Sequence, residues 1–437
     1  MTAVQAAVTV TDVAVGNLYS LFLKSDGSLW AMGNNVAGQL GDGTFNNTNR
    51  PEQILSNGVV AIAAGFRHSL FIKSDGSLWV MGSNQYGQLG DGTFNNTNSP
   101  EQIVSSGVVA AAAGGQHSLF LKSDGSLWAV GYNGFGALGN GTFNNTNLPQ
   151  QIVASGVVGI ATGENHSLFV KSDGSLWAMG FNSDGQLGDG TANNTNQPEQ
   201  VVSSGVTAVA GGGGFSLFLK SDSSLWGMGS GVFGQLGDSV YVTNKPTEIV
   251  FSNVVAIAAA WQHSVFLKSD GSLCVMGANQ YGQLGDGTLN NTNQPETITS
   301  NVVAIAKGPE AKHSLFAKSD GSLWGMGNDS FFQLGDGFSS NTSLPEQILP
   351  FPQPTLSESI HSMTNLQLTG TCYFGGKYCV LAGTNLAQPL SQWAFIGTNT
   401  ITIRGSNNFY LVDGQRKQIY LNINPDVSQQ FYILQSQ

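Results

Sequence analysis

The heptad KSDGSLW at Lys24–Trp30 decides the fold, because the same seven letters recur along the whole first part of the chain. Identical copies, and the near-copies KSDSSLW and KSDGSLC, follow at Lys73–Trp79, Lys122–Trp128, Lys171–Trp177, Lys220–Trp226, Lys268–Cys274 and Lys318–Trp324. Successive copies lie 49, 49, 49, 49, 48 and 50 residues apart. A period of this size is typical of propellers and repeat arrays.

One unit, Val59–Val104, contains four predicted strands. Val59–Ala64 is apolar throughout, and Ser69–Ile72 and Ser77–Met81 flank the turn Ser-Asp-Gly, in which glycine adopts a positive φ. A fourth strand, Glu101–Val104, is expected directly after a proline, which suits a sheet edge. Repeated Gly and the Pro argue against helices. The repeats therefore predict an all-β, seven-bladed β-propeller, with an extended solenoid as the alternative.

The repeats also predict the domain organisation of the 437-residue chain. The propeller is expected over residues 1–349, with units near 10–58, 59–107, 108–156, 157–205, 206–253, 254–301 and 302–349. The apolar segment Ala3–Val10 is a candidate to add a strand to the last blade. Residues 350–358 contain three prolines and are predicted to form a stiff linker. Residues 359–437 show alternating strand patterns and are predicted to form a small β-sandwich.

The repeated blocks resemble a known family. The stretches AAGFRHSLFIKSDGSLW (Ala63–Trp79) and GSNQYGQLGDGT (Gly82–Thr93) are similar to the repeats of the regulator of chromosome condensation family. The resemblance extends over Val10–Leu349 and implies a seven-bladed propeller with about 50 residues per blade. Members of that family include a nucleotide exchange factor for a small GTPase, a plant ultraviolet photoreceptor and secreted bacterial β-lactamase inhibitors. The resemblance therefore implies the fold and leaves the activity open.

The C-terminal region resembles the terminal β-sandwich of secreted proteins from some bacterial groups. The similar features are the G-x-x-Y turn at Gly375–Tyr378, the T-N-L at Thr384–Leu386, Trp393 and the closing Phe431–Leu434. This resemblance implies a role in surface display, sorting or assembly.

Two of the three cysteines, Cys372 and Cys379, flank the sequence YFGGKY. A two-residue hairpin turn at Gly375–Gly376 places them opposite each other, so a cross-strand disulfide is predicted. Two reduced neighbouring thiols are the alternative. A disulfide favours an oxidising compartment. The third cysteine, Cys274, occupies the Trp position of a repeat and is expected to be a buried apolar substitute.

Composition and charge narrow the classes of partner. The net charge is −11, only 10% of residues are charged, and the basic residues form no cluster. Nucleic acid is therefore not an expected partner. No stretch approaches 18 apolar residues, so no membrane span is expected. The first residues lack the basic end and apolar run of a signal peptide, so the chain is either cytosolic or already processed.

Chemically reactive residues occur in the repeats but do not predict catalysis. Five histidines share one phase of the repeat, where Tyr19 and Phe215 stand in the first and fifth units: His68, His117, His166, His263 and His313. A catalytic or metal-binding His is not expected to be replaced by Phe, so we assign these five a structural role. No catalytic residue, cofactor or metal site is predicted, and the protein is not expected to be an enzyme. Oxygen-bearing side chains at Asp42, Thr44, Asn46 and Thr48 leave Ca²⁺ binding as an alternative to local turn stabilisation.

A candidate binding face follows from strand order. In a four-stranded meander, the first and third connections lie on one side of the ring and the Ser-Asp-Gly turns on the other. The first side varies between units and is rich in aromatic residues, which are typical of recognition surfaces. Its candidate residues are Phe66, Arg67, Tyr86, Gln116, Tyr132, Phe135, Glu164, Phe181, Asp184, Phe233, Trp261, Tyr281, Lys312 and Phe331. The alternative is that several of these rings pack between blades.

These observations favour a non-enzymatic, extracellular or cell-surface binding or structural protein, and self-assembly into a surface layer or filament is compatible with them. Its partner would be a second copy or another protein. One alternative is an adhesin or inhibitor whose aromatic face binds a protein or glycan. Another is a cytoplasmic regulator that resembles an exchange factor for a small GTPase.

Overall fold

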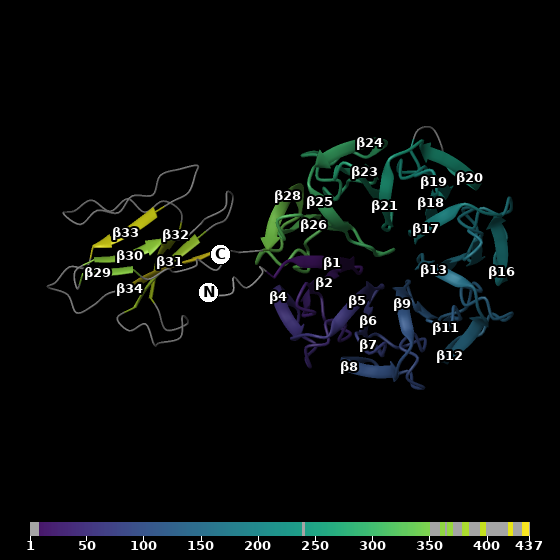
Figure 1. The fold of residues 1–437 in the computed structure, drawn as a ribbon, viewed down its shortest axis with the longest axis horizontal. Coiled ribbons are helices and arrows are strands. Elements are labelled where there is room, and N and C mark those ends of the chain that lie inside the picture. The colour runs from purple at the N-terminus through teal and green to yellow at the C-terminus, as the bar shows by residue number, and fades with distance from the viewer. Residues whose placement is uncertain are drawn as a thin grey trace, which may run out of the picture. The chain divides into compact units, whose positions relative to one another are not determined.

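The computed structural model of the protein describes residues 8–237 and 241–349 and, in the remainder of the chain, six separate strands. The repeats form seven antiparallel sheets of four strands, each of which is one blade (Figure 1). First strands of neighbouring blades contact one another around the ring. Strands β1 (Val10–Val15) and β25 (Val302–Ile305) also contact each other and close it. The predicted seven-bladed propeller is confirmed.

The strand bounds repeat with the sequence. The first three blades comprise β1, β2 (Tyr19–Lys24), β3 (Leu29–Gly33) and β4 (Thr48–Leu55); β5 (Val59–Ala64), β6 (His68–Lys73), β7 (Leu78–Gly82) and β8 (Thr97–Val104); β9 (Val108–Ala113), β10 (His117–Lys122), β11 (Leu127–Gly131) and β12 (Thr146–Val153). The next two comprise β13 (Val157–Thr162), β14 (His166–Lys171), β15 (Leu176–Gly180) and β16 (Thr195–Val202); β17 (Val206–Gly211), β18 (Phe215–Lys220), β19 (Leu225–Ser230) and β20 (Val242–Val250). The last two comprise β21 (Val254–Ala259), β22 (His263–Lys268), β23 (Leu273–Gly277) and β24 (Thr292–Thr299); β25, β26 (His313–Lys318), β27 (Leu323–Gly327) and β28 (Thr342–Leu349).

The chain divides into two units, Met1–Ile348 and Leu349–Gln437. The described strands of the second unit form two three-stranded antiparallel sheets, ordered β29-β30-β33 and β32-β31-β34. They are β29 (Ser359–Ser362), β30 (Asn365–Thr369), β31 (Tyr378–Gly383), β32 (Ala394–Thr398), β33 (Gln418–Asn422) and β34 (Phe431–Ser436). The predicted linker and Cys372 lie outside the described residues, so the β-sandwich and the disulfide stay predictions. No helix in the described part of the chain is long and apolar enough to cross a membrane.

The repeated heptad is a structural unit on each blade, as the second copy shows. The backbone N–H and hydroxyl of Ser77 both donate to Asp75, and the indole N–H of Trp79 donates to the Ser77 hydroxyl at 2.9 Å. The Lys73 ammonium lies 4.0 Å from the centre of the Trp79 ring, and Phe71 stacks on the same ring with an interplanar angle of 6°. The heptad therefore orders a turn, a cation–π contact and an aromatic pair.

The outermost strand differs from its prediction. Strand β8 begins at Thr97 and includes Pro100, whereas the sequence predicted a strand only after that proline. The pairing of β7 with β8 shifts register between Val80 and Gly82, next to the proline. Because β8 is hydrogen-bonded on one side only, the missing N–H of Pro100 leaves no ladder bond broken. A proline stands at the equivalent place in all seven outermost strands, which also discourages edge-to-edge association.

The first and last blades are joined by hydrogen bonds between described residues. The described seventh sheet contains β25 to β28 only, so the described part of Ala3–Val10 adds no strand to it. Val15 N–H instead donates to the Lys307 carbonyl at 3.0 Å, and Val10 N–H donates to the Gly321 carbonyl. The hydrogen bond from Val10 to Gly321 is equivalent to that from Val59 to Gly27, which joins the first and second blades.

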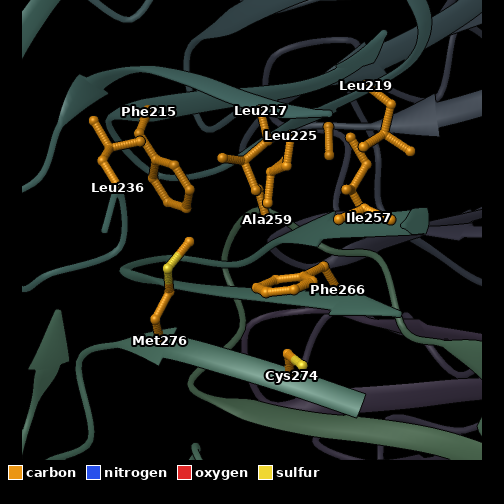
Figure 2. Packing of buried hydrophobic residues seen from close by; sticks show 12 residues of the cluster. Phe215, Leu217, Leu219, Leu225, Leu236, Ile257, Ala259, Phe266, Cys274 and Met276 are labelled. Atoms are coloured by element: carbon orange, nitrogen blue, oxygen red, sulfur yellow. The ribbon is translucent and has the colours of Figure 1, made fainter. Parts of the chain in front are cut away.

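The core consists of apolar layers between neighbouring blades. Figure 2 shows the layer between the fifth and sixth blades, where Phe215 and Leu217 of one blade face Ile257, Phe266 and other residues of the next. Cys274 belongs to this layer with 1% of its surface exposed, which confirms that it is a buried apolar substitute. Each blade therefore needs both neighbours to bury its faces, and this requirement favours a closed ring.

Candidate binding face

The first and third connections of every blade are joined on one side of the ring. In the third blade, Tyr132 N–H donates to the Gln116 carbonyl at 2.8 Å, and in the fourth Phe181 N–H donates to the Asn165 carbonyl. The Ser-Asp-Gly turns instead bond to the connections between blades, as Ser123 N–H does to Gly107. We call the side formed by the first and third connections the variable face and the opposite side the uniform face.

The first turns of all seven blades are linked into a ring around the axis, which we call the axial ring (residues 16–18, 65–67, 114–116, 163–165, 212–214, 260–262 and 306–312). The linking hydrogen bonds run from Asn17 N to Phe66 O, Phe66 N to Gly114 O, Gly115 N to Glu164 O, Glu164 N to Gly212 O, Gly213 N to Trp261 O, and Trp261 N to Ala311 O. The amide side chain of Asn17 closes the ring by donating to the Glu310 carbonyl at 3.2 Å. The backbone of the axial ring is therefore held by hydrogen bonds between neighbouring blades.

The second loop is held by a repeated glutamine in six of the seven blades, the third blade having Ala137 in its place. Its side-chain oxygen accepts the backbone N–H of the residue two positions earlier, for example from Tyr86 to Gln88 and from Tyr281 to Gln283. The residue so fixed is the variable one, and it is Ala37, Tyr86, Asp184, Phe233, Tyr281 or Phe331 in the blades that carry this glutamine. The same frame thus presents Ala, Tyr, Asp or Phe, depending on the blade.

Four of the predicted residues form one continuous aromatic row, made of Tyr86, Tyr132, Phe135 and Phe181. The ring centres of Tyr86 and Tyr132 lie 5.1 Å apart, those of Tyr132 and Phe135 lie 5.9 Å apart, and those of Phe135 and Phe181 lie 4.8 Å apart. The rings meet at 54–75°, and all four are half-buried. The aromatic row therefore spans the second, third and fourth blades.

A second group combines two rings and a cation. The Lys312 ammonium lies 4.1 Å from the Trp261 ring centre and 5.7 Å from that of Tyr281. Trp261 also lies against the backbone of Gly213, where an added Cβ would approach its ring to 2.8 Å. Trp261 is thus half-buried between neighbouring turns and part of the variable face at once.

The remaining predicted residues are spread around the face. Arg67 is exposed and lies 5.1 Å from the Phe66 ring, while Gln116 and Phe233 are half-buried and Phe331 is 39% exposed. Glu164 lies on the axial ring, and Asp184 lies close to Gly214 of the next blade.

The five repeat histidines latch neighbouring blades together. The Nε2 atom of His117 lies 2.9 Å from the Ser167 hydroxyl of the next blade, and Ser167 donates its proton to the Ala137 carbonyl. His117 must therefore donate from Nε2, and its lowered pKa keeps it neutral at pH 7. Burial lowers the pKa of His117 to about 4 and that of His68 to about 3. The predicted structural role is confirmed.

The Asp-Thr loops are ordered by their own hydrogen bonds. Asp42 accepts from the backbone N–H of Thr44 at 2.8 Å and from the side chain of Asn35 at 2.9 Å. These contacts match the predicted turn stabilisation, and no cluster suited to a metal ion occurs among the described residues.

Sequence reasoning missed two sets of residues on this side of the molecule. One is Glu310, which lies in a seventh turn that is two residues longer than the others: Ile305 to His313 spans eight positions, and Ile62 to His68 spans six. The other is a set of exposed apolar residues, one at the same loop position in each of four blades: Phe45, Phe94, Phe143 and Leu289, 51–59% exposed. Comparing the units position by position reveals both.

Comparison with known proteins agrees with the fold. Residues 2–218 and 101–380 match the family model described as RCC1-like domain. No curated protein matches the chain. The human WBSCR16 structure is 24% identical with a TM-score of 0.66, over 75% of this chain and 96% of that one. Yeast RCC1 (Prp20), solved with Kap60 bound, is 21% identical with a TM-score of 0.67, over 81% and 90%. Prp20p of Saccharomyces cerevisiae, in a structure whose description mentions binding to Gsp1p and histones, is 22% identical with a TM-score of 0.66, over 76% and 88%. The family model covers most of the propeller, so the chain belongs to the family of proteins that contain an RCC1-like domain.

Proposed function

We propose that the protein is a non-enzymatic binding protein whose variable face binds a protein partner outside the cell. The aromatic row is the observation that carries this proposal. Four half-buried rings from three blades form one surface, at positions where the blades differ from one another. Large aromatic side chains with limited conformational freedom dominate the binding energy of protein interfaces. The extracellular location rests on the predicted disulfide and on the resemblance of the C-terminal region.

The arrangement of the face favours binding over catalysis. The histidines are buried, neutral and used between blades, so they offer no base to a substrate. In the aromatic row, by contrast, the backbone N–H of Tyr86 is held by Gln88, and those of Tyr132 and Phe181 are held by the first turns of their blades. A preformed surface loses little conformational entropy on binding.

A photo-cross-linking experiment tests the proposal. The amino acid p-benzoylphenylalanine is placed at Phe135 in the aromatic row, or at the exposed control position Phe143, in the full-length protein in its source cells. The expected result is a cross-link from position 135 to one protein and none to that protein from position 143. A chain that cross-links to nothing from position 135, although it is folded and expressed, would contradict the proposal.

Self-assembly is a second candidate, supported by a different observation. Phe45, Phe94 and Phe143 project at equivalent loop positions and are 51–55% exposed. Repeated apolar contacts of this kind suit association of identical copies, since many weak contacts add up. Light scattering on a size-exclusion column should then give a mass that grows above 45.8 kDa with concentration. The double variant Phe94→Ala/Phe143→Ala should return it to one chain, and a constant monomer mass for the wild type would eliminate this candidate.

A glycan-binding face and an exchange-factor-like regulator remain weaker candidates. Aromatic rings also bind sugars, but the rings here meet edge to face and so offer no flat stacking surface. The exchange-factor reading rests on fold similarity alone, which does not carry activity.

A further inference from the structure

The longer turn of the seventh blade brings a carboxyl group to the centre of the axial ring. Glu310 is only 5% exposed, and its carbonyl is fixed by Asn17. Its side chain reaches the far side of the ring, because a Cβ added to Gly115 of the third blade would lie 3.0 Å from Oε1 of Glu310. The seventh and third blades are not neighbours, so the Glu310 side chain must span the ring.

A second carboxyl group lies beside it. Glu164 belongs to the fourth blade, is half-buried, and its carbonyl accepts the N–H of Gly115. Burial and then the charge of Glu164 raise the pKa of Glu310 to about 8, and Lys312 acts in the opposite direction. Burial also raises the pKa of Glu164. The two carboxyl groups therefore repel each other when both are ionised.

No hydrogen bond to the Glu310 carboxyl group is found among the described residues, although only 5% of the residue is exposed. One ammonium, that of Lys312, faces this pair, and it rests on the Trp261 ring at 4.1 Å. Two other charged residues of the variable face are Arg67, whose guanidinium lies on the Phe66 ring of the second blade, and Asp184, whose carboxylate lies beside Gly214. The centre of the axial ring thus lacks one positive charge when both glutamates are ionised.

We infer that the centre of the axial ring binds a basic side chain, lysine or arginine, of the protein partner that docks on the variable face. This inference rests on the proposed function and specifies the chemistry of the partner. A guanidinium or ammonium group placed beside Glu164 would pair with both carboxylates and supply the donors that Glu310 lacks. The rings of Phe66 and Trp261, both on the axial ring, can stack on such a cation, as the Trp261 ring already does with Lys312. Binding would release the proton that Glu310 holds at neutral pH.

Calorimetry with the full-length protein tests the inference. The probe is the peptide acetyl-Gly-Arg-Gly-amide, and the control is the same peptide with neutral citrulline. The arginine peptide should bind at least tenfold more tightly than the citrulline peptide. Its affinity should rise from pH 6.5 to pH 8.5, because below a pKa of about 8 binding must first remove the Glu310 proton.

Two isosteric variants and a matched control complete the test. Glu164→Gln and Glu310→Gln should each weaken binding of the arginine peptide at least tenfold, and Glu310→Gln should also abolish its pH dependence, whereas the exposed Glu101→Gln should change neither. Equal affinity for arginine and citrulline in the wild type, or unchanged binding by Glu310→Gln, would overturn the inference. The peptide comparison and its proton release use the wild-type protein, so they hold even if a variant folds poorly.

The outcome can be separated from that of the proposed function. If the peptides bind alike but a partner still cross-links from position 135, the inference fails and the proposed function stands. If the arginine peptide binds specifically but position 135 cross-links to no protein, the proposed function fails and the cation site remains.

Discussion

Replacing Asp329 by asparagine should stabilise the propeller, and the gain should depend on pH. Five other blades have asparagine at this position; in the first, Asn35 donates its amide N–H to Asp42 at 2.9 Å and to the Thr44 carbonyl at 3.1 Å. Asp329 is fully buried, and its Oδ2 atom has no hydrogen-bond partner. When it is ionised, Asp329 therefore places an acceptor where five other blades have a donor.

The size of the effect follows from the pKa of Asp329. Burial, together with Asp336 and Glu346, raises it from 3.8 to about 8. A raised pKa means that the unfolded state releases its proton first, so stability falls as pH rises from about 4 towards 8. Between pH 3.8 and pH 7 this costs about 4 kcal/mol, at 1.36 kcal/mol per pH unit. Asp329→Asn should recover at least half of that cost at pH 7 and much less at pH 4.

Urea denaturation of both proteins at pH 4, 5.5 and 7 measures the difference. Comparison with the wild type at each pH removes effects that the two proteins share. The reciprocal change Asn279→Asp in the sixth blade is the control and should destabilise the protein, more strongly at pH 7 than at pH 4. An Asp329→Asn protein that is no more stable at pH 7, or equally stabilised at both pH values, would refute the reasoning.

Three further changes test other parts of the structure. The five repeat histidines have pKa values of about 3–4 in the folded protein and are neutral there, so unfolding takes up protons below pH 6.5. The free energy of unfolding should therefore fall by about 2 kcal/mol per histidine between pH 7 and pH 5. A urea midpoint that stays constant over this range would contradict their burial. Ser223 has a φ of 65° where the other six turns have glycine, so Ser223→Gly should raise the unfolding free energy by about 1 kcal/mol, and a lower urea midpoint would show that the serine hydroxyl matters more. Cys274→Trp should raise the free energy of unfolding by about 1 kcal/mol, because the new ring would stack between Phe266 and Lys268. This gain should be smaller when Lys268 is replaced by Met. An equal gain in both backgrounds would show that the cation–π contact contributes nothing.

The fold could be predicted because its determinants are local and repeated. The turn of the heptad is stabilised by contacts within seven residues, such as that of Asp75 with Ser77. The heptad that forms these contacts occurs seven times in the sequence with small changes. The side of the ring on which the variable residues lie followed from strand order alone. The extent of the outermost strands did not, because Pro100 reads as a boundary unless the strand is known to have a free edge.

The arrangement of the candidate site could be predicted only in part. The residues of the aromatic row were identified from their variation, but their contacts depend on how three blades are placed around the axis. Trp261 was predicted to lie on the binding face, with packing between blades as the alternative; it is half-buried, against Gly213 of one neighbouring blade and Lys312 of the other. Glu310 was missed because a two-residue insertion has no counterpart in the other units, and its reach to Gly115 joins residues almost 200 positions apart.

Binding of a protein partner by the variable face depends most directly on the aromatic row. The decisive measurement is the affinity of the partner captured from position 135 for the wild-type protein and for the double variant Tyr132→Ala/Phe135→Ala, with Phe94→Ala/Phe143→Ala as a control that removes two equally aromatic but isolated side chains. Loss of two central rings should cost about 2 kcal/mol or more, so the account predicts at least a thirtyfold weaker affinity for the first variant and an unchanged affinity for the control. Equal affinities for wild type and Tyr132→Ala/Phe135→Ala, or a loss confined to Phe94→Ala/Phe143→Ala, would contradict it.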